Sequence, residues 1–129
     1  MTETFRLADA AVTMEPSGLS VTTFRDGGVV KAWPGDRQED RARAVSLGYA
    51  QDVSQLTWQH LVAMSRDHEA SHHLLAHWLG LDRSPTLHGV SRNRYWPHWH
   101  REEAAALALQ AFALAAGVDL LAILRRTAG

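Results

Sequence analysis

The chain has 129 residues, of which 46% are apolar and 21% charged; this suits one globular domain and excludes an intrinsically disordered protein. Its formal net charge of −1 provides no overall field that would attract nucleic acid or an anionic membrane. Cysteine is absent, which excludes disulfides, thiolate zinc sites and thiol catalysis and leaves histidine and carboxylate as the strong metal ligands.

The N-terminal segment, residues 1–11, lacks the apolar core of a secretory signal. Residues 104–124 are the one stretch to test against a membrane span. They are mostly alanine and include Asp119, so buried helices are predicted there instead. All but one of the 13 basic residues are arginine, a bias typical of GC-rich bacterial coding sequences. Together these features predict a cytoplasmic protein of bacterial type.

The first predicted elements are β-strands. Residues 19–24 and 29–33 are rich in β-branched and aromatic side chains, and Gly27 and Gly28 between them can supply the positive φ of a tight turn. An earlier strand at 11–15 would add a third. We therefore predict a β hairpin or a three-stranded meander in the β region, residues 1–35.

Residues 36–129 are predicted to be mainly helical. Asp36 and Glu39 have the chemistry of a capping box for a first helix that ends at about Leu47. Asp52 can cap a long second helix, which stops at Gly80. The predicted helices span about 36–47, 53–79 (with a candidate break at 65–67), 85–90, 101–116 and 119–126, with a loop at 91–99. Because a hairpin is not stable alone, the strands must pack on these helices, which gives a single α+β domain over residues 1–129.

The longest predicted helix is rich in histidine, and all eight histidines of the chain lie within residues 60–100. A helical wheel places His68 and His72 on the apolar stripe, so both are expected to point inward. A second, wetter side of the helix is predicted to carry Glu69, His73 and His77.

His68, Glu69 and His72 form a His-Glu-x-x-His motif. Two histidines four residues apart on a helix present their imidazoles to one point. The glutamate after the first histidine sits where it can act on a metal-bound water. Zinc would lower the pKa of that water toward about 7, and Glu69 would be the general base. The candidates for the third ligand are Glu102, Glu103, His98 and His100.

The order of a hairpin, a His-Glu-x-x-His helix and a later helix that carries glutamates is similar to small gluzincin-type metalloproteases. The resemblance covers five motif residues and a spacing. It implies a zinc-dependent hydrolase with Glu69 as its base. The extended metzincin motif is excluded, because Trp78 stands where that motif has its third histidine.

The interpretation that the sequence alone favours is structural. Inward histidines can be satisfied by acidic side chains or main-chain carbonyls without a metal ion. The chain is then a noncatalytic interaction module or a self-associating protein, and no stoichiometric zinc is expected in it. The zinc-dependent hydrolase is the alternative.

The predicted loop before the 101–116 helix interleaves cations with large aromatic rings, a composition that suits an anchored connector, a pocket lid or a partner surface. A protein partner or a second copy is the expected occupant of such a surface. Local nucleic-acid binding is a further alternative, which the near-neutral charge disfavours. The residues concerned are Arg92, Arg94, Tyr95, Trp96 and Trp99.

Overall fold

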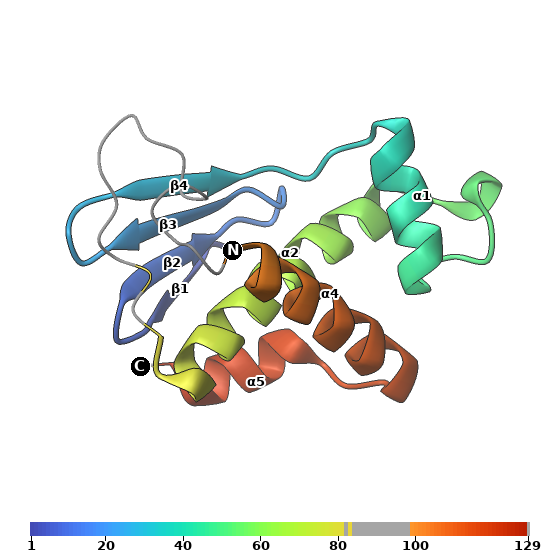
Figure 1. Cartoon of the computed structure of the whole chain (residues 1–129). Helices are drawn as coiled ribbons and strands as arrows, with labels where there is room; N and C mark the ends of the chain where they lie inside the picture. The colour runs from blue at the N-terminus through green and yellow to red at the C-terminus, as the bar shows by residue number, and fades with distance from the viewer. Residues whose placement is uncertain (82, 84–98, 129) are drawn as a thin grey trace.

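The computed structural model, which describes residues 1–81, 83 and 99–128, has the predicted α+β architecture (Figure 1). An antiparallel sheet precedes the helices. The strands are β1 (Glu3–Arg6), β2 (Ala10–Met14), β3 (Ser20–Phe24) and β4 (Val29–Ala32). The helices are α1 (Gln38–Leu47), the short 3₁₀ helix Val53–Gln55, α2 (Trp58–Leu79), α4 (Trp99–Ala116) and α5 (Leu120–Thr127).

The sheet is a meander with the strand order β1-β2-β3-β4. Its β3-β4 hairpin turns through Gly27, whose φ of 89° needs a residue without Cβ. Alternate residues of β2 face the helices, and Val12 and Met14 are fully buried there. The predicted hairpin and its third strand are therefore confirmed.

The strand β1 was missed by the sequence pattern. It pairs with β2 from Glu3 opposite Met14 to Arg6 opposite Ala11. Its stability comes from tertiary contacts, because Phe5 inserts into the core and Glu3 binds Arg125 of α5 through two hydrogen bonds of 2.7 and 2.8 Å. A four-residue strand that is stabilised by distant residues has little signal in its own sequence.

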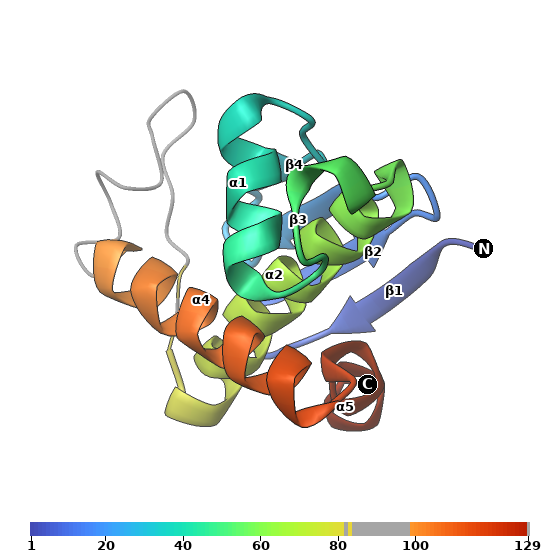
Figure 2. The same cartoon turned by 90° about the vertical axis from the view of Figure 1, so that its right-hand side faces the viewer.

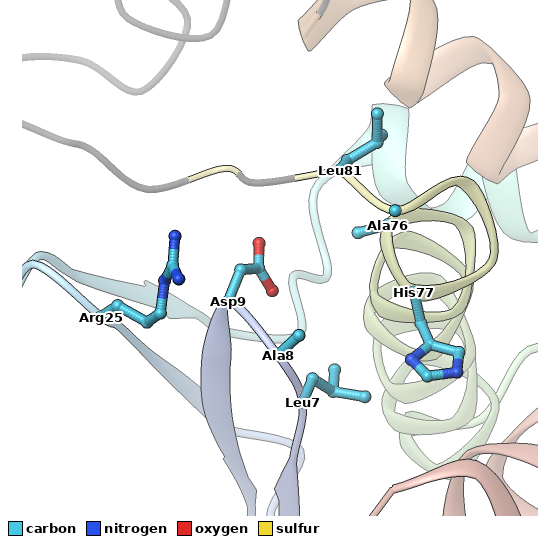
Figure 3. Close-up of a pocket in the computed structure, with 8 residues that line it drawn as sticks. Leu7, Ala8, Asp9, Arg25, Ala76, His77 and Leu81 are labelled. Atoms are coloured by element: carbon cyan, nitrogen blue, oxygen red, sulfur yellow. The ribbon is translucent and has the colours of Figure 1, made fainter.

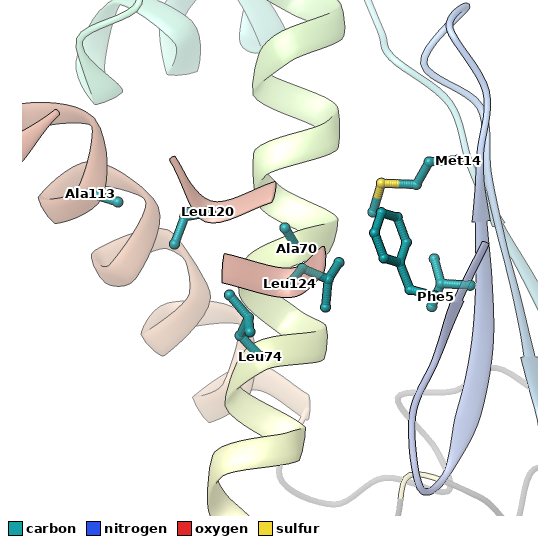
Figure 4. Packing of buried hydrophobic residues seen from close by; sticks show 8 residues of the cluster. Phe5, Met14, Ala70, Leu74, Ala113, Leu120 and Leu124 are labelled. Carbon is teal, nitrogen blue, oxygen red and sulfur yellow. The ribbon is translucent and has the colours of Figure 1, made fainter. Parts of the chain in front are cut away.

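Helix α2 is the central element, with the sheet on one side of it and α4 and α5 on the other (Figures 1 and 2). Side chains from the sheet, α2, α4 and α5 meet in one apolar cluster (Figure 4). The cluster consists of Phe5, Val12, Met14, Ala70, Leu74, Ala113, Leu120 and Leu124.

The helical-wheel prediction is wrong for one residue, because α2 is buried on two sides. His73 is 1% exposed, although it was assigned to a wetter side, because that side of α2 faces the sheet. His77, on the last turn, is exposed as predicted. Leu79 is 67% exposed, because the helix ends there.

The predicted helix starts are displaced by a few residues. Helix α1 begins after Arg37, whose main-chain N–H donates to the Asp40 carboxylate at 3.0 Å, so the predicted Asp36 and Glu39 pair is one residue too early. Asp52 caps the 3₁₀ helix, and Thr57 caps α2 by accepting a hydrogen bond from the His60 N–H. Helix α2 runs without a break and ends at Gly80, whose φ is 66°.

The predicted helix at 85–90 and the loop at 91–98 lie outside the described residues. Within the described part of the chain, no single helix is long and apolar enough to cross a membrane. Residues 101–116 and α5 meet the length and composition criteria together, but the pair is bent by 112°.

Candidate metal centre

Among the described residues, Glu103 is the candidate third ligand that meets both histidines of the motif. His68 and His72 lie one turn apart on α2, with their Nε2 atoms 3.1 Å apart and their rings nearly perpendicular. Glu103 reaches both from α4: its Oε1 is 2.6 Å from His68 Nε2, and its Oε2 is 3.2 Å from His72 Nε2. One ligand atom from each of the three residues lies within 4.8 Å of the other two. This triad has the residue types of a two-histidine, one-carboxylate metal site.

Gln110 fixes the orientation of the His68 ring. The side-chain Nε2 of this buried glutamine donates to the main-chain carbonyl of Met64 and to the Tyr49 hydroxyl, both at 2.9 Å. Its Oε1 is therefore left to accept a hydrogen bond from His68 Nδ1, at 3.0 Å. Nδ1 of His68 is thus committed to Gln110, and Nε2 is the nitrogen of this ring that faces Glu103 and His72.

Tyr49 continues this network outward. Its hydroxyl donates a 2.5 Å hydrogen bond to the Asp67 carboxylate. Burial and the neighbouring Asp67 carboxylate raise the pKa of Tyr49, so the phenol stays protonated and remains a donor to Asp67. Since the hydroxyl proton is committed to Asp67, its oxygen is available to accept from Gln110.

A chain of buried charges lies behind His72. The Nδ1 atom of His72 faces Glu102 Oε1 at 3.5 Å, and the same oxygen is 4.0 Å from Arg83 Nη1. Arg83, only 1% exposed, binds the Asp9 carboxylate through Nε at 2.8 Å and Nη2 at 3.0 Å. A carboxylate at the far nitrogen of a histidine holds the ring so that the other nitrogen can bind a metal. Glu102, a candidate ligand from the sequence, therefore lies on the opposite side of His72 from Glu103.

The electrostatics of the triad favour a cation between its members. Burial alone would lower the pKa of His72, but the Glu102 and Glu103 carboxylates outweigh it and hold that pKa above its ordinary value. Burial alone would raise the pKa of Glu103, but hydrogen bonds from His68 and His72 hold it far below its ordinary value. Glu103 is therefore ionised, and its charge attracts either a proton on an imidazole or a metal ion.

A cleft of about 150 Å³ opens beside the triad. Its walls come from the end of β4 and residues 33–35, from α1, from α2 and from Gln110 of α4. Both His68 and Glu69 line this cleft. The candidate general base and one candidate ligand thus share a space that a small substrate group can enter.

Glu69 has a buried histidine behind it. Arg83 Nη2 donates to His73 Nδ1 at 3.0 Å, so the Nδ1 atom of His73 is an acceptor. The Nε2 atom of His73 lies 3.3 Å from Thr22 Oγ1 of β3 and 3.8 Å from Glu69 Oε2. Glu69 is therefore positioned between the cleft and the sheet.

The chain matches no protein family, no curated protein and no solved structure with which it was compared. The geometry of the triad and its surroundings is thus the basis for the functional argument.

The remaining candidates from the sequence lie wholly or partly outside the described residues. His98 and the loop residues Arg92, Arg94, Tyr95 and Trp96 lie outside the described part of the chain. Trp99 and His100 belong to the first turn of α4, and only their backbone is described.

A second and larger pocket lies away from the triad (Figure 3). It has a volume of about 260 Å³, and Asp9, Arg25 and His77 are among its lining residues. None of the three candidate ligands lines it. Pocket size alone therefore does not locate the candidate chemistry.

The residues that orient the ligands were not singled out from the sequence. Gln110 could have been identified from the sequence, because it is the one polar residue within an alanine-rich helical stretch. Arg83 and Asp9 have none, since they are 74 positions apart in the chain and meet only through the tertiary fold.

Proposed function

We propose that the chain binds one zinc ion through His68, His72 and Glu103 and is a zinc-dependent hydrolase. The observation that carries the proposal is the convergence of one ligand atom from each of these residues within 4.8 Å. The hydrogen bond from His68 to Gln110 supports it, because it commits Nδ1 and turns Nε2, the nitrogen that would bind the metal, toward the convergence point. The preset ring orientation reduces the rearrangement that metal binding requires.

The observed separations suit a tetrahedral ion with little movement. Two ligands at about 2.1 Å from zinc, with a tetrahedral angle between them, are about 3.4 Å apart. The two Nε2 atoms are 3.1 Å apart, and His72 Nε2 is 3.2 Å from Glu103. The 2.6 Å contact of Glu103 with His68 must lengthen by less than 1 Å. Three protein ligands leave the fourth position for water or substrate, as in catalytic zinc sites.

The proposed chemistry is hydrolysis of a carbonyl compound. A zinc ion held by the triad would supply a water of pKa about 7 and polarise the substrate carbonyl. Glu69 lines the cleft beside His68 and is the candidate that accepts the proton of the attacking water and delivers it to the leaving group. The resemblance to gluzincin-type metalloproteases suggests that the scissile bond is a peptide bond.

A second candidate function is the noncatalytic module that the sequence favours. The observation for it is that Glu103 contacts both histidines directly, while His72 is only 2% exposed. A proton shared within this cluster can satisfy the rings without a metal ion. In this interpretation the triad stabilises the packing of α4 on α2, and the surface serves a partner or self-association.

Zinc titration of the metal-free protein separates the two functions. We expect one zinc per chain for the native protein and roughly hundredfold weaker binding for His72→Ala, since a structural zinc site gains about 3 kcal/mol per ligand. His77→Ala is the matched control, because this histidine is on the same helix, is exposed and lies outside the triad. Its affinity should equal that of the native protein. No stoichiometric binding, or equal weakening by both substitutions, would support the noncatalytic module.

A further inference from the structure

We propose that Arg43 makes the cleft beside the triad selective for substrates that carry a carboxylate, an inference that rests on the zinc-dependent hydrolase proposed above. Arg43 is on α1, and it lines the same cleft as His68 and Glu69. Arg43 is exposed, so the cleft presents an accessible guanidinium on the wall formed by α1 and a candidate metal ligand and base on the wall formed by α2.

The charge of Arg43 is not used elsewhere in the described part of the chain. Within those residues Arg43 has no hydrogen bond or ion pair, whereas Arg66, Arg83 and Arg125 are each paired with a carboxylate. An exposed cation that lines a concave site and has no protein partner is available to bind a ligand anion. The fork of N–H donors on a guanidinium matches the two oxygens of a carboxylate.

The nearest acidic residue on α1, Asp40, lines the same cleft but is engaged by the start of the helix. Asp40 accepts a hydrogen bond from the Arg37 N–H at 3.0 Å, which places its charge at the positive end of the helix. Its carboxylate also packs against Gly35, where a Cβ atom would collide with it. Asp40 is therefore held by the start of α1, and it makes no ion pair with Arg43 among the described residues.

The backbone at Arg43 is held in place by the packing of α1 on α2. The next residue, Ala44, is fully buried against Leu61 and Met64 of α2. Trp33, which is 66% exposed, lines the same cleft and offers an apolar surface for the substrate chain. The small volume of the cleft, about 150 Å³, limits the distance between the reacting carbonyl and the recognised carboxylate to a few bonds.

Two probes of equal size test this inference on the zinc-loaded protein. The mono-hydroxamate of succinic acid binds zinc through its hydroxamate and carries a carboxylate two carbons away; its primary amide has the same shape without the charge. Calorimetric titration of the native protein should show about tenfold tighter binding of the carboxylate probe, the size of one charge-assisted interaction. Arg43→Gln should remove this preference and leave binding of the amide probe unchanged. Arg43→Lys should retain part of it.

Arg41→Gln is the control for a general change of charge on α1. The Arg41 guanidinium is held by the main-chain oxygen of Asp36 and does not line the cleft, so the preference should persist in this variant. Equal affinity of the two probes for the native zinc-loaded protein overturns the role of Arg43 and leaves the metal centre standing. Failure of both probes to bind the zinc-loaded protein, or failure of the protein to hold zinc, overturns the proposed function together with this inference.

Discussion

Glu69→Gln is expected to slow zinc-dependent hydrolysis by about a hundredfold or more while zinc stays bound. The amide side chain has nearly the shape of the carboxylate but cannot accept a proton from water at neutral pH. General-base catalysis contributes about a hundredfold to ten-thousandfold to such reactions, and we expect a fall of this size. Zinc affinity should change little, because Glu69 is not one of the three converging ligands.

The measurement is cleavage of a defined mixture of short peptides by the zinc-loaded protein, with the new termini detected by mass spectrometry. Glu39→Gln is the matched control, since this glutamate is exposed on α1 and does not line the cleft. The Glu39→Gln protein should cleave the peptides at the native rate. A native rate in Glu69→Gln would remove the general base from the mechanism, and a zinc-loaded native protein without any cleavage would contradict the hydrolase.

Asp9→Asn is expected to destabilise the protein by about 3 to 5 kcal/mol. Removing one partner of a buried ion pair leaves the other charge buried without compensation, and this costs far more than the pair contributes. Arg83 would keep its charge at a buried position after the substitution. The free energy of unfolding, measured by urea denaturation, should fall by this amount, whereas exposed Asp36→Asn should change it by less than about 0.5 kcal/mol.

The buried ion pair of Asp9 and Arg83 also predicts that the stability of the protein depends on pH. Burial alone would raise the pKa of Asp9, but the Arg83 guanidinium outweighs it and holds that pKa below its ordinary value. The Asp9 contribution to stability is therefore present at neutral pH and is lost as the pH falls through the lowered pKa. The native protein should lose more stability between pH 5 and acidic pH than Asp9→Asn does, in denaturation curves recorded across that range. Equal losses of stability in the native protein and in Asp9→Asn would contradict the assignment of this pH dependence to Asp9.

Local patterns predicted most of the fold. The hairpin has its β-branched strands and glycine turn, and α2 has its length and its glycine stop. Errors arose where two signals competed, as at Asp52 and Thr57, which both cap a helical turn. They also arose where tertiary contacts decide the structure, as in β1, whose Phe5 and Glu3 are held by distant elements.

The candidate site was predictable in part. The His-Glu-x-x-His spacing placed His68 and His72 on one side of α2 because four residues are about one helical turn. The third ligand could not be chosen, since Glu102 and Glu103 are neighbours and only the packing of α4 on α2 decides which one faces the Nε2 atoms. The cleft and the role of Arg43 depend on how α1 packs against α2, which no local pattern records.

The central claim is that two imidazoles and one carboxylate hold a zinc ion. X-ray absorption at the zinc edge, recorded on protein that was loaded with zinc and then desalted, tests this claim most directly. We expect one zinc per chain with four ligands at about 2.0 to 2.1 Å, of which two are imidazoles, and the loss of one imidazole signal in His72→Ala. Protein that retains no zinc, or zinc with fewer than two imidazole ligands, would contradict the account.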